Sequence, residues 1–360
     1  TPAPAASNPP PACHPPTAAG GGGDGPPATG SSASSLSRRS GSTAGSTRSA
    51  HAVCSPHRST TASRAAGTDA RREDGAGAGD EPSGVVAADL NGDANVDVVT
   101  GNRQGDDVTV MLGLGTGLLS PPVAYPAGGR IEAIALADLD GDGDGDLVAA
   151  AYDDDAINVL LGDGMGIFTP GVSLSSAAQP VDIALGRLDP DLHLDLAIAN
   201  RMTNNVRLRP GDGAGGFGSQ QALSAGTRPT AIAIADLDSN GGGDIIVAHQ
   251  DSDDVMVRFE NGTGGYLPGV FIVVGMSVRD VIVEDLDADG ALDIAVANLD
   301  SDDVVVLLGD GAGAFAPPVA FPTMTSAFAL ASGDLNEDGI PDLVVTLPMT
   351  NELGLILSAP

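Results

Sequence analysis

The feature that most constrains this chain is a phrase that recurs along it at a fixed spacing. Each copy starts with an aspartate-rich loop and runs into a short apolar segment, as in DLDGDGDGDLVAA at Asp138. The six copies begin at residues 89, 138, 187, 236, 285 and 334, so successive starts are 49 residues apart. Because no 3.6-residue period runs through the units, stacked helix pairs are disfavoured and strands are favoured.

Within one unit the apolar segments are short and are separated by turn residues. In the second unit they span residues 134–137, 147–151, 157–161 and 167–172, with Gly and Asp clustered between them. Val, Ile and Leu suit strands, whereas Gly and Asp suit tight turns. Four antiparallel strands repeated radially form a propeller blade. The sequence therefore predicts an all-β fold, a six-bladed β-propeller with four-stranded antiparallel blades.

The end of the last unit leaves an alternative open. Only 26 residues follow Asp334, so the sixth unit has no room for a full fourth strand. A closing strand from the N-terminal side would be usual. Residues 74–78 repeat the DGAGA of residues 310–314, but the apolar strand that should follow them is missing. The alternative prediction is part of a seven-bladed propeller.

The composition changes sharply near residue 84. Residues 1–83 consist mostly of Ala, Gly, Pro, Ser, Thr and Arg, with hardly any Val, Ile, Leu or Phe. Such a segment lacks the side chains that a core needs, so we expect a disordered low-complexity tail or linker. The alternative is an interaction arm that uses Arg38, Arg39, Arg71 and Arg72. Residues 84–360 form the predicted propeller domain.

The charge of the chain limits its partners. Forty-eight acidic residues stand against 16 arginines and no lysine, which gives a formal net charge of −32. This charge repels phosphate backbones and anionic headgroups, so we expect no nucleic-acid partner and no insertion into a membrane. Both cysteines, Cys13 and Cys54, precede the repeats, which therefore have no disulfide framework. We expect a monomer whose charge is offset by bound cations.

Each intact loop carries oxygen-bearing side chains at the same positions, counted from its first residue. Positions 1, 3, 5 and 9 hold Asp or Asn, and position 7 offers a backbone carbonyl. Ca²⁺ takes about six to eight oxygen ligands, whereas Mg²⁺ tends to keep its waters. Glycine at position 6 permits the sharp turn in four loops, and blade one has Ala94 there. The predicted ligands of about five Ca²⁺ ions are Asp89, Asn91, Asp93, Asn95, Asp97, Asp138, Asp140, Asp142, Asp144, Asp146, Asp236, Asp238, Asn240, Gly242, Asp244, Asp285, Asp287, Asp289, Ala291, Asp293, Asp334, Asn336, Asp338, Ile340 and Asp342.

Two other interpretations of the loops are disfavoured. An EF-hand needs flanking helices and a bidentate Glu at position 12. These loops stand between strand-like segments, and position 12 holds Thr, Ala or Val. Asp/Gly turns that bind nothing are a second interpretation, but five loops carry their oxygens in register. A calcium-binding loop is therefore the favoured interpretation.

The loop of the third unit departs from the pattern. Its position 1 is Arg187, although Asp189, Asp191 and Asp195 remain. A guanidinium group can satisfy several carboxylate oxygens, so we expect Arg187 to bridge these acids and take the place of the ion. His193 at position 7 is expected to be a solvated loop residue.

The loops, together with GDGxGxF turns at Gly162, Gly211 and Gly309, resemble the FG-GAP/VCBS repeat family. This is the blade type of the integrin α-subunit propeller, and the resemblance covers residues 84–357. It implies Ca²⁺ in the 1-3-5-7-9 loops. It also implies an extracellular adhesion or ligand-binding role.

We therefore expect a secreted or cell-surface module that binds an extracellular protein or glycan and whose calcium is structural. The strand order places the hairpins between second and third strands on the face opposite the calcium loops. Residues expected to form a polar ligand mouth there are Arg103, Arg130, Arg201, Arg228, Arg279, Asn102, Asn200, His249 and Asn298. The alternative is that they are scattered, solvated loop residues.

Two other functions stay open. A calcium-dependent carbohydrate-active enzyme resembling a polysaccharide lyase needs a base and a charge-stabilising partner within reach of each other. The repeats offer few candidates and no nucleophile motif; these candidates are His193, His249, Tyr125, Tyr152 and Tyr266. A lectin usually needs an aromatic platform, and this chain has no Trp.

Overall fold

The computed structural model describes residues 52–53, 77–176 and 178–358. The chain divides into two units, Thr1–Gly45 and Ser46–Pro360, and all of the described residues belong to the second. Most of the predicted tail (residues 1–83), including the four arginines of the alternative interaction arm, lies outside the described residues.

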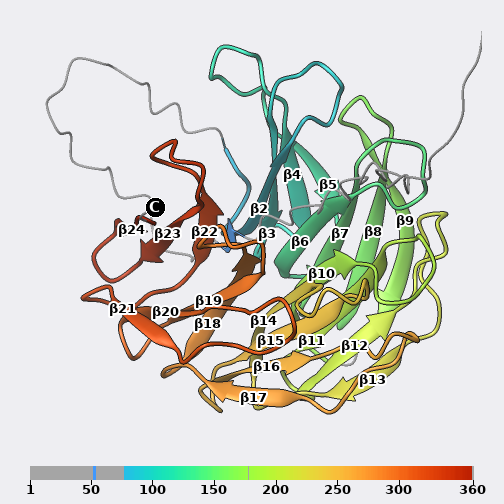
Figure 1. Cartoon of the computed structure of the whole chain (residues 1–360). Coiled ribbons are helices and arrows are strands. Elements are labelled where there is room, and N and C mark those ends of the chain that lie inside the picture. Colours follow the sequence, from blue (N-terminus) through green and yellow to red (C-terminus); the bar gives the residue numbers. More distant parts are fainter. Residues whose placement is uncertain (1–51, 54–76, 177, 359–360) are drawn as a thin grey trace, which may run out of the picture. The chain divides into compact units, whose positions relative to one another are not determined.

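The described residues form six antiparallel sheets that follow one another along the chain (Figure 1). This arrangement confirms the predicted six-bladed β-propeller. Blades one to three contain β2 (Pro82–Ala88), β3 (Asp97–Asn102), β4 (Asp107–Met111), β5 (Val123–Pro126), β6 (Ile131–Ala137), β7 (Asp146–Ala151), β8 (Ala156–Gly162), β9 (Phe168–Ser175), β10 (Pro180–Gly186), β11 (Asp195–Asn200), β12 (Asn205–Arg209) and β13 (Gln221–Ser224). Blades four to six contain β14 (Pro229–Ala235), β15 (Asp244–His249), β16 (Asp254–Arg258), β17 (Val270–Val273), β18 (Val278–Glu284), β19 (Asp293–Asn298), β20 (Asp303–Leu307), β21 (Val319–Pro322), β22 (Leu330–Gly333), β23 (Asp342–Leu347) and β24 (Glu352–Ile356).

The first and last blades differ from the four between them. Blade six has three strands in the described chain, as the short final unit led us to expect. Blade one carries the additional strand β1 (Ala52–Val53), which pairs antiparallel with β2. Strand β2 begins at Pro82, and the turn before it is tied to blade one because Arg103 N donates to Glu81 O at 3.0 Å.

The second strand of each blade is the most deeply buried. Every residue of β7, β11, β15 and β19 is buried. A sheet that is covered on both faces needs apolar side chains on both, which explains why these segments are continuous apolar runs and do not alternate. The outer strands, such as β17, are largely exposed.

The core is divided among the interfaces between consecutive blades. Five apolar clusters join blade one to two, two to three, three to four, four to five and five to six. The first strands also pack in sequence, from β2 on β6 to β18 on β22. Among the described residues, no apolar cluster joins blade six to blade one. Each blade is therefore stabilised mainly by its neighbours along the chain.

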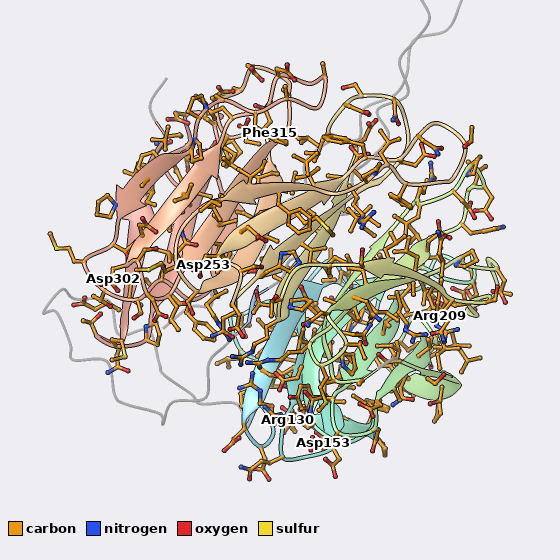
Figure 2. All side chains as sticks on the ribbon, turned by 90° about the horizontal axis from the view of Figure 1, so that it is seen from below. Arg130, Asp153, Arg209, Asp253, Asp302 and Phe315 are labelled. Atoms are coloured by element: carbon orange, nitrogen blue, oxygen red, sulfur yellow. The ribbon has the colours of Figure 1, made fainter. Side chains whose placement is uncertain are left out.

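The two ends of each blade carry different connections. The loops from first to second strand and the turns from third to fourth strand share one end. The turns from second to third strand share the other end with the links to the next blade. Figure 2 labels Phe315 and Asp302 at opposite ends of blade five. The predicted calcium loops therefore lie at one end of the blades, and the five arginines of the predicted ligand mouth lie at the other.

Candidate metal centres

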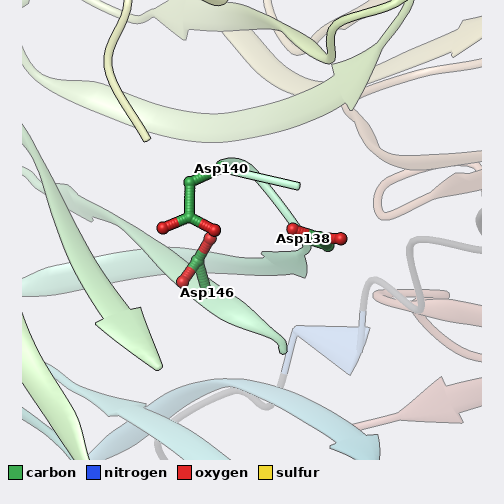
Figure 3. Close-up of side chains that lie close together, drawn as sticks. All are labelled: Asp138, Asp140 and Asp146. Atoms are coloured by element: carbon green, nitrogen blue, oxygen red, sulfur yellow. The ribbon is translucent and has the colours of Figure 1, made fainter. Parts of the chain in front are cut away.

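The aspartate-rich loops connect the first and second strands of their blades. In blade two the loop leaves β6 at Ala137 and enters β7 at Asp146. Figure 3 shows Asp138, Asp140 and Asp146 converging from the two ends of this loop. One carboxylate oxygen from each lies within 4.8 Å of the others, which is close enough for a shared cation.

The structure brings some of the predicted ligands together and not others. Three-carboxylate groups in the described chain are Asp138, Asp140, Asp146; Asp189, Asp191, Asp195; Asp236, Asp238, Asp244; and Asp285, Asp287, Asp289. Blades one and six form no such group among the described residues. Their position 3 is Asn91 or Asn336, whose amide oxygen offers a neutral ligand in place of a carboxylate.

The backbone of the five intact loops follows one pattern. Positions 4 and 6 both adopt positive φ angles in all five, as in Gly141 (79°) and Gly143 (94°). Even Ala94, which stands at position 6 of blade one, has a φ of 67°. Such angles are costly for residues other than glycine. The repeated conformation therefore confirms that the intact loops require a sharp turn at position 6.

The carboxylates at the start of each loop are held by its own backbone. Asp138 accepts hydrogen bonds from Gly141 N at 2.7 Å and Gly143 N at 3.1 Å. Asp142 accepts one from Asp144 N at 2.9 Å. Carboxylate oxygens retain further lone pairs after these bonds. The donor set of clustered carboxylate and amide oxygens fits a hard cation such as Ca²⁺.

The aspartate at position 9 has a structural role that sequence reasoning missed. In blade two, Asp146 accepts a hydrogen bond from Leu139 N at 2.9 Å and another from Gly162 N at 2.9 Å. These bonds tie the start of the loop and the end of the third strand to the second strand. The residues that make the same pair of bonds are Asp97, Asp146, Asp195, Asp244, Asp293 and Asp342. All six are buried.

A signal for this role was present in the sequence. Position 9 is the only loop position that holds Asp in all six units, including the degenerate third unit. A residue that persists where the other ligands are altered indicates a function other than metal binding alone. The hydrogen bonds supply that function in every blade.

Four of the six position-9 carboxylates lie in an unfavourable electrostatic environment. Burial raises the pKa of Asp146, Asp195 and Asp293, and it raises the pKa of Asp244 to about 6. The charges of nearby loop acids, such as Asp238 beside Asp244, raise these pKa values further. Buried like charges favour protonation or a bound cation. A divalent ion would offset this repulsion.

The loop of blade three corrects one prediction. Arg187 is exposed and forms no ion pair or hydrogen bond through its side chain with any described residue, so the expected bridge to the three acids is absent. Neither Pro190 nor Leu192 adopts a positive φ, so this backbone differs from the intact loops. Proline fixes φ near −65°, which prevents the shared conformation at position 4. His193 is exposed, as expected.

A second correction concerns the predicted polar mouth. Asn102, Asn200, His249 and Asn298 are fully buried at the ends of second strands. They bond within the fold: His249 Nδ1 lies 2.7 Å from Asp254, and Asn298 donates to Asp303 at 2.8 Å. These side chains stabilise the turns between second and third strands and are too buried to contact a ligand.

The fold and the loops together define a β-propeller whose blades carry repeated, aspartate-rich loops between their first two strands. The FG-GAP-like repeat profile matches residues 89–149, 138–198, 187–247 and 285–345, which make up more than half of the chain. The chain belongs to the FG-GAP-like repeat family. None of the curated proteins matches it.

Several solved structures share the fold. A lectin from Agrocybe aegerita, described as recognising non-reducing terminal N-acetylglucosamine, has a TM-score of 0.54 and 20% identity, covering 73% of this chain and 74% of its own. BBS1N, solved in complex with ARL6DN, has a TM-score of 0.55 and 14% identity, with coverages of 77% and 79%. A functionally unknown protein from Desulfotomaculum acetoxidans has a TM-score of 0.51 and 12% identity, with coverages of 74% and 80%. At these identities the likeness establishes the fold alone.

The described residues contain no helix that is long and apolar enough to cross a lipid bilayer.

Proposed function

We propose that this protein is a calcium-stabilised propeller that serves as a ligand-binding or scaffold module outside the cell. The observation that carries the proposal is the repetition of one loop conformation in five blades. In each, positions 4 and 6 take left-handed backbone angles and the oxygen-bearing residues stand in the same register. A chance set of acidic turns has no reason to keep both features.

The chain's own residues supply the oxygens for such an ion. In blade two, Asp138, Asp140 and Asp146 already converge, and Asp142 lies in the same loop. Bound Ca²⁺ would supply positive charge among these carboxylates and cross-link the two strands that flank the loop. Asp146 also holds Leu139 N and Gly162 N, so it couples an ion in the loop to the third strand.

The proposed location follows from calcium concentration. Sites of ~10⁻⁴ M affinity, as in extracellular modules, stay empty at cytosolic calcium levels and fill at ~1–2 mM. A fold whose loops need the ion is therefore suited to the outside of the cell. The acidic surface and the FG-GAP-like repeats support the same location.

Binding is the function that the fold supports best. The fold is shared with the Agrocybe aegerita lectin and with BBS1N, which binds another protein in its crystal. We propose an extracellular protein or glycan as the ligand. The lyase-like alternative has little support, since His249 is buried and paired with Asp254, and Tyr266 donates its hydroxyl to Gly243 O within the fold.

Calcium removal tests the proposal. With ~10⁻⁴ M affinity and ~1–2 mM calcium, each site adds roughly 1.5 kcal/mol by mass action, or on the order of 7 kcal/mol for five sites. We expect EGTA to lower the Tm by on the order of 10 °C. Native mass spectrometry should find five bound calcium ions, and excess Mg²⁺ is the matched control. An unchanged Tm in EGTA would contradict the proposal.

A further inference from the structure

Five of the nine arginines in the repeats gather at the end of the blades opposite the aspartate-rich loops. We call Arg103, Arg130, Arg201, Arg228 and Arg279 the arginine mouth. A repeated hydrogen bond holds this end together: the residue after the second strand donates its N–H to the link before the first strand. Tyr152 N donates to Arg130 O at 3.0 Å, and Gln250 N donates to Arg228 O at 2.9 Å. Figure 2 shows Arg130 and Asp153 together at this end of blade two.

A β-bulge supplies one of these side chains. The first strands of blades one to five each contain a register shift at their second residue. The bulged residue is Glu132 in blade two and Arg279 in blade five. A bulge leaves one residue unpaired in the ladder and redirects its side chain. The guanidinium of Arg279 lies over the ring of Phe328, 4.6 Å from its centroid.

Three of the five arginines have carboxylate partners. Arg103 and Arg130 both contact Glu132, each at 2.7 Å, and Arg228 contacts Asp251 at 3.1 Å. These ion pairs offset the charges of three of the five arginines. The positive charges of the remaining two arginines, Arg201 and Arg279, are not neutralised in this way.

Arg201 and Arg279 have no carboxylate partner among the described residues. Among the described residues, the side chain of Arg201 donates only to the neutral Gln250, at 3.2 Å. The side chain of Arg279 makes no hydrogen bond with any described residue, and its Nε is one of four buried arginine Nε atoms without a partner there. Burial, followed by mutual repulsion with Arg201 and Arg103, lowers the pKa of Arg279. Buried donors are almost always satisfied in native proteins, so this group calls for an acceptor.

We propose that the arginine mouth binds a carboxylate group of a small organic acid through the side chains of Arg201 and Arg279. Guanidinium groups match the planar carboxylate with two parallel hydrogen bonds, and partial burial strengthens them. The formal charge of −32 favours a small ligand over a polyanion, because long-range repulsion grows with the ligand's own charge. The inference rests on the proposed function as a ligand-binding module and adds a small acid to the protein or glycan proposed above.

Calorimetry on the calcium-loaded full chain tests this site. Succinate is the probe, and the neutral succinamide is its matched control. We expect saturable binding of succinate and none of succinamide. Arg279→Gln and Arg201→Gln should each weaken succinate binding about tenfold or more, since each removes a charge-assisted pair. Arg279→Lys should weaken it less than Arg279→Gln because the charge remains. The Tm of each variant in calcium verifies that it is folded.

Arg187→Gln is the control for a general loss of positive charge. It removes one exposed arginine at the other end of the blades, and we expect succinate affinity to stay unchanged. Equal weakening by this variant would overturn the proposal, as would absence of succinate binding by the folded protein. Preferential binding of heparin or polygalacturonate would assign the mouth to polyanions and overturn it as well. Calcium content and the EGTA effect, measured on the same sample, report separately on the proposed function.

Discussion

Replacing the position-9 aspartate separates the structural role of this residue from metal binding. The two variants to compare are Asp195→Ala in blade three and Asp146→Ala in blade two. Both remove a buried carboxylate that accepts two backbone N–H groups. Of the two, only Asp146 lies in a loop with the conformation shared by the five predicted calcium loops, because the blade-three backbone differs at positions 4 and 6.

The expected cost follows from the lost hydrogen bonds. Asp195→Ala leaves Leu188 N and Gly211 N without acceptors, and each unpaired buried group costs about 1–3 kcal/mol. Burial raises the pKa of Asp195, so its ionised form is disfavoured in the folded protein. Removing this carboxylate therefore offsets part of the loss in the free energy of unfolding. We therefore expect a loss of about 3 kcal/mol, equal in calcium and in EGTA. Asp146→Ala should lose about the same in EGTA and roughly 1.5 kcal/mol more in ~1–2 mM calcium.

Urea unfolding of each variant, with calcium and with EGTA, measures both terms. Asp191→Ala is the matched control, since Asp191 is exposed and accepts a single bond from His193 N. We expect it to change stability by no more than about 0.5 kcal/mol. A loss below about 1 kcal/mol for Asp195→Ala would refute the reasoning from buried hydrogen bonds. Equal calcium dependence of the Asp146 and Asp195 variants would refute the assignment of the two loops.

Four further changes probe the loops and the boundary of the domain. Gly143→Ala should destabilise blade two by about 1–2 kcal/mol, because a φ of 94° is strained for alanine. No neighbouring atom lies within 4 Å of the added Cβ, so this cost comes from the backbone conformation and not from a clash. Ala94→Gly should raise stability, because it relieves the same strain at a φ of 67°. Both effects are measured by urea unfolding, and a neutral Gly143→Ala would contradict the strain. Arg187→Asp should raise the calcium count in native mass spectrometry from five to six because it restores the carboxylate at position 1, whereas an ion in the unmodified blade-three loop would contradict its exclusion. Removal of residues 1–76 should lower the Tm only slightly, because it removes the two-residue strand β1 but no described core residue, and a large decrease would show that this segment stabilises the fold.

Much of the fold followed from the spacing of the repeats. The 49-residue period and the short apolar runs correctly predicted six blades, and the 26 residues after Asp334 correctly predicted a short last blade. Strand β1 was not predicted because Ala52 and Val53 stand in a segment with no apolar pattern. Backbone pairing needs no side-chain signal, so a two-residue strand leaves little trace in a sequence.

The candidate site was only partly predictable. Spacing identified the loops and the need for a turn at position 6, since glycine there is a local backbone signal. Spacing did not show that Asn102 and His249 point into the fold, because their partners come from the same blade's turns and from the preceding link. It also suggested an ion pair for Arg187 from charge alone, although the exposed side chain has no such partner. Side-chain direction depends on tertiary packing, which a repeat pattern does not encode.

The division of chemistry between the two ends of the blades has a consequence for how calcium acts. The apolar clusters join each blade to the next along the chain, so stability is a sum of blade terms and nearest-neighbour terms. An ion in one loop stabilises the first two strands of its blade, and the position-9 aspartate carries this constraint to the third. The arginine mouth lies at the other ends of these same strands, with Arg279 on β18 and Arg201 directly after β11. An ion in the loop of blade five would thereby stabilise the strand that carries Arg279 without contacting the ligand, whereas Arg201 follows a strand of blade three, whose loop we expect to hold no ion.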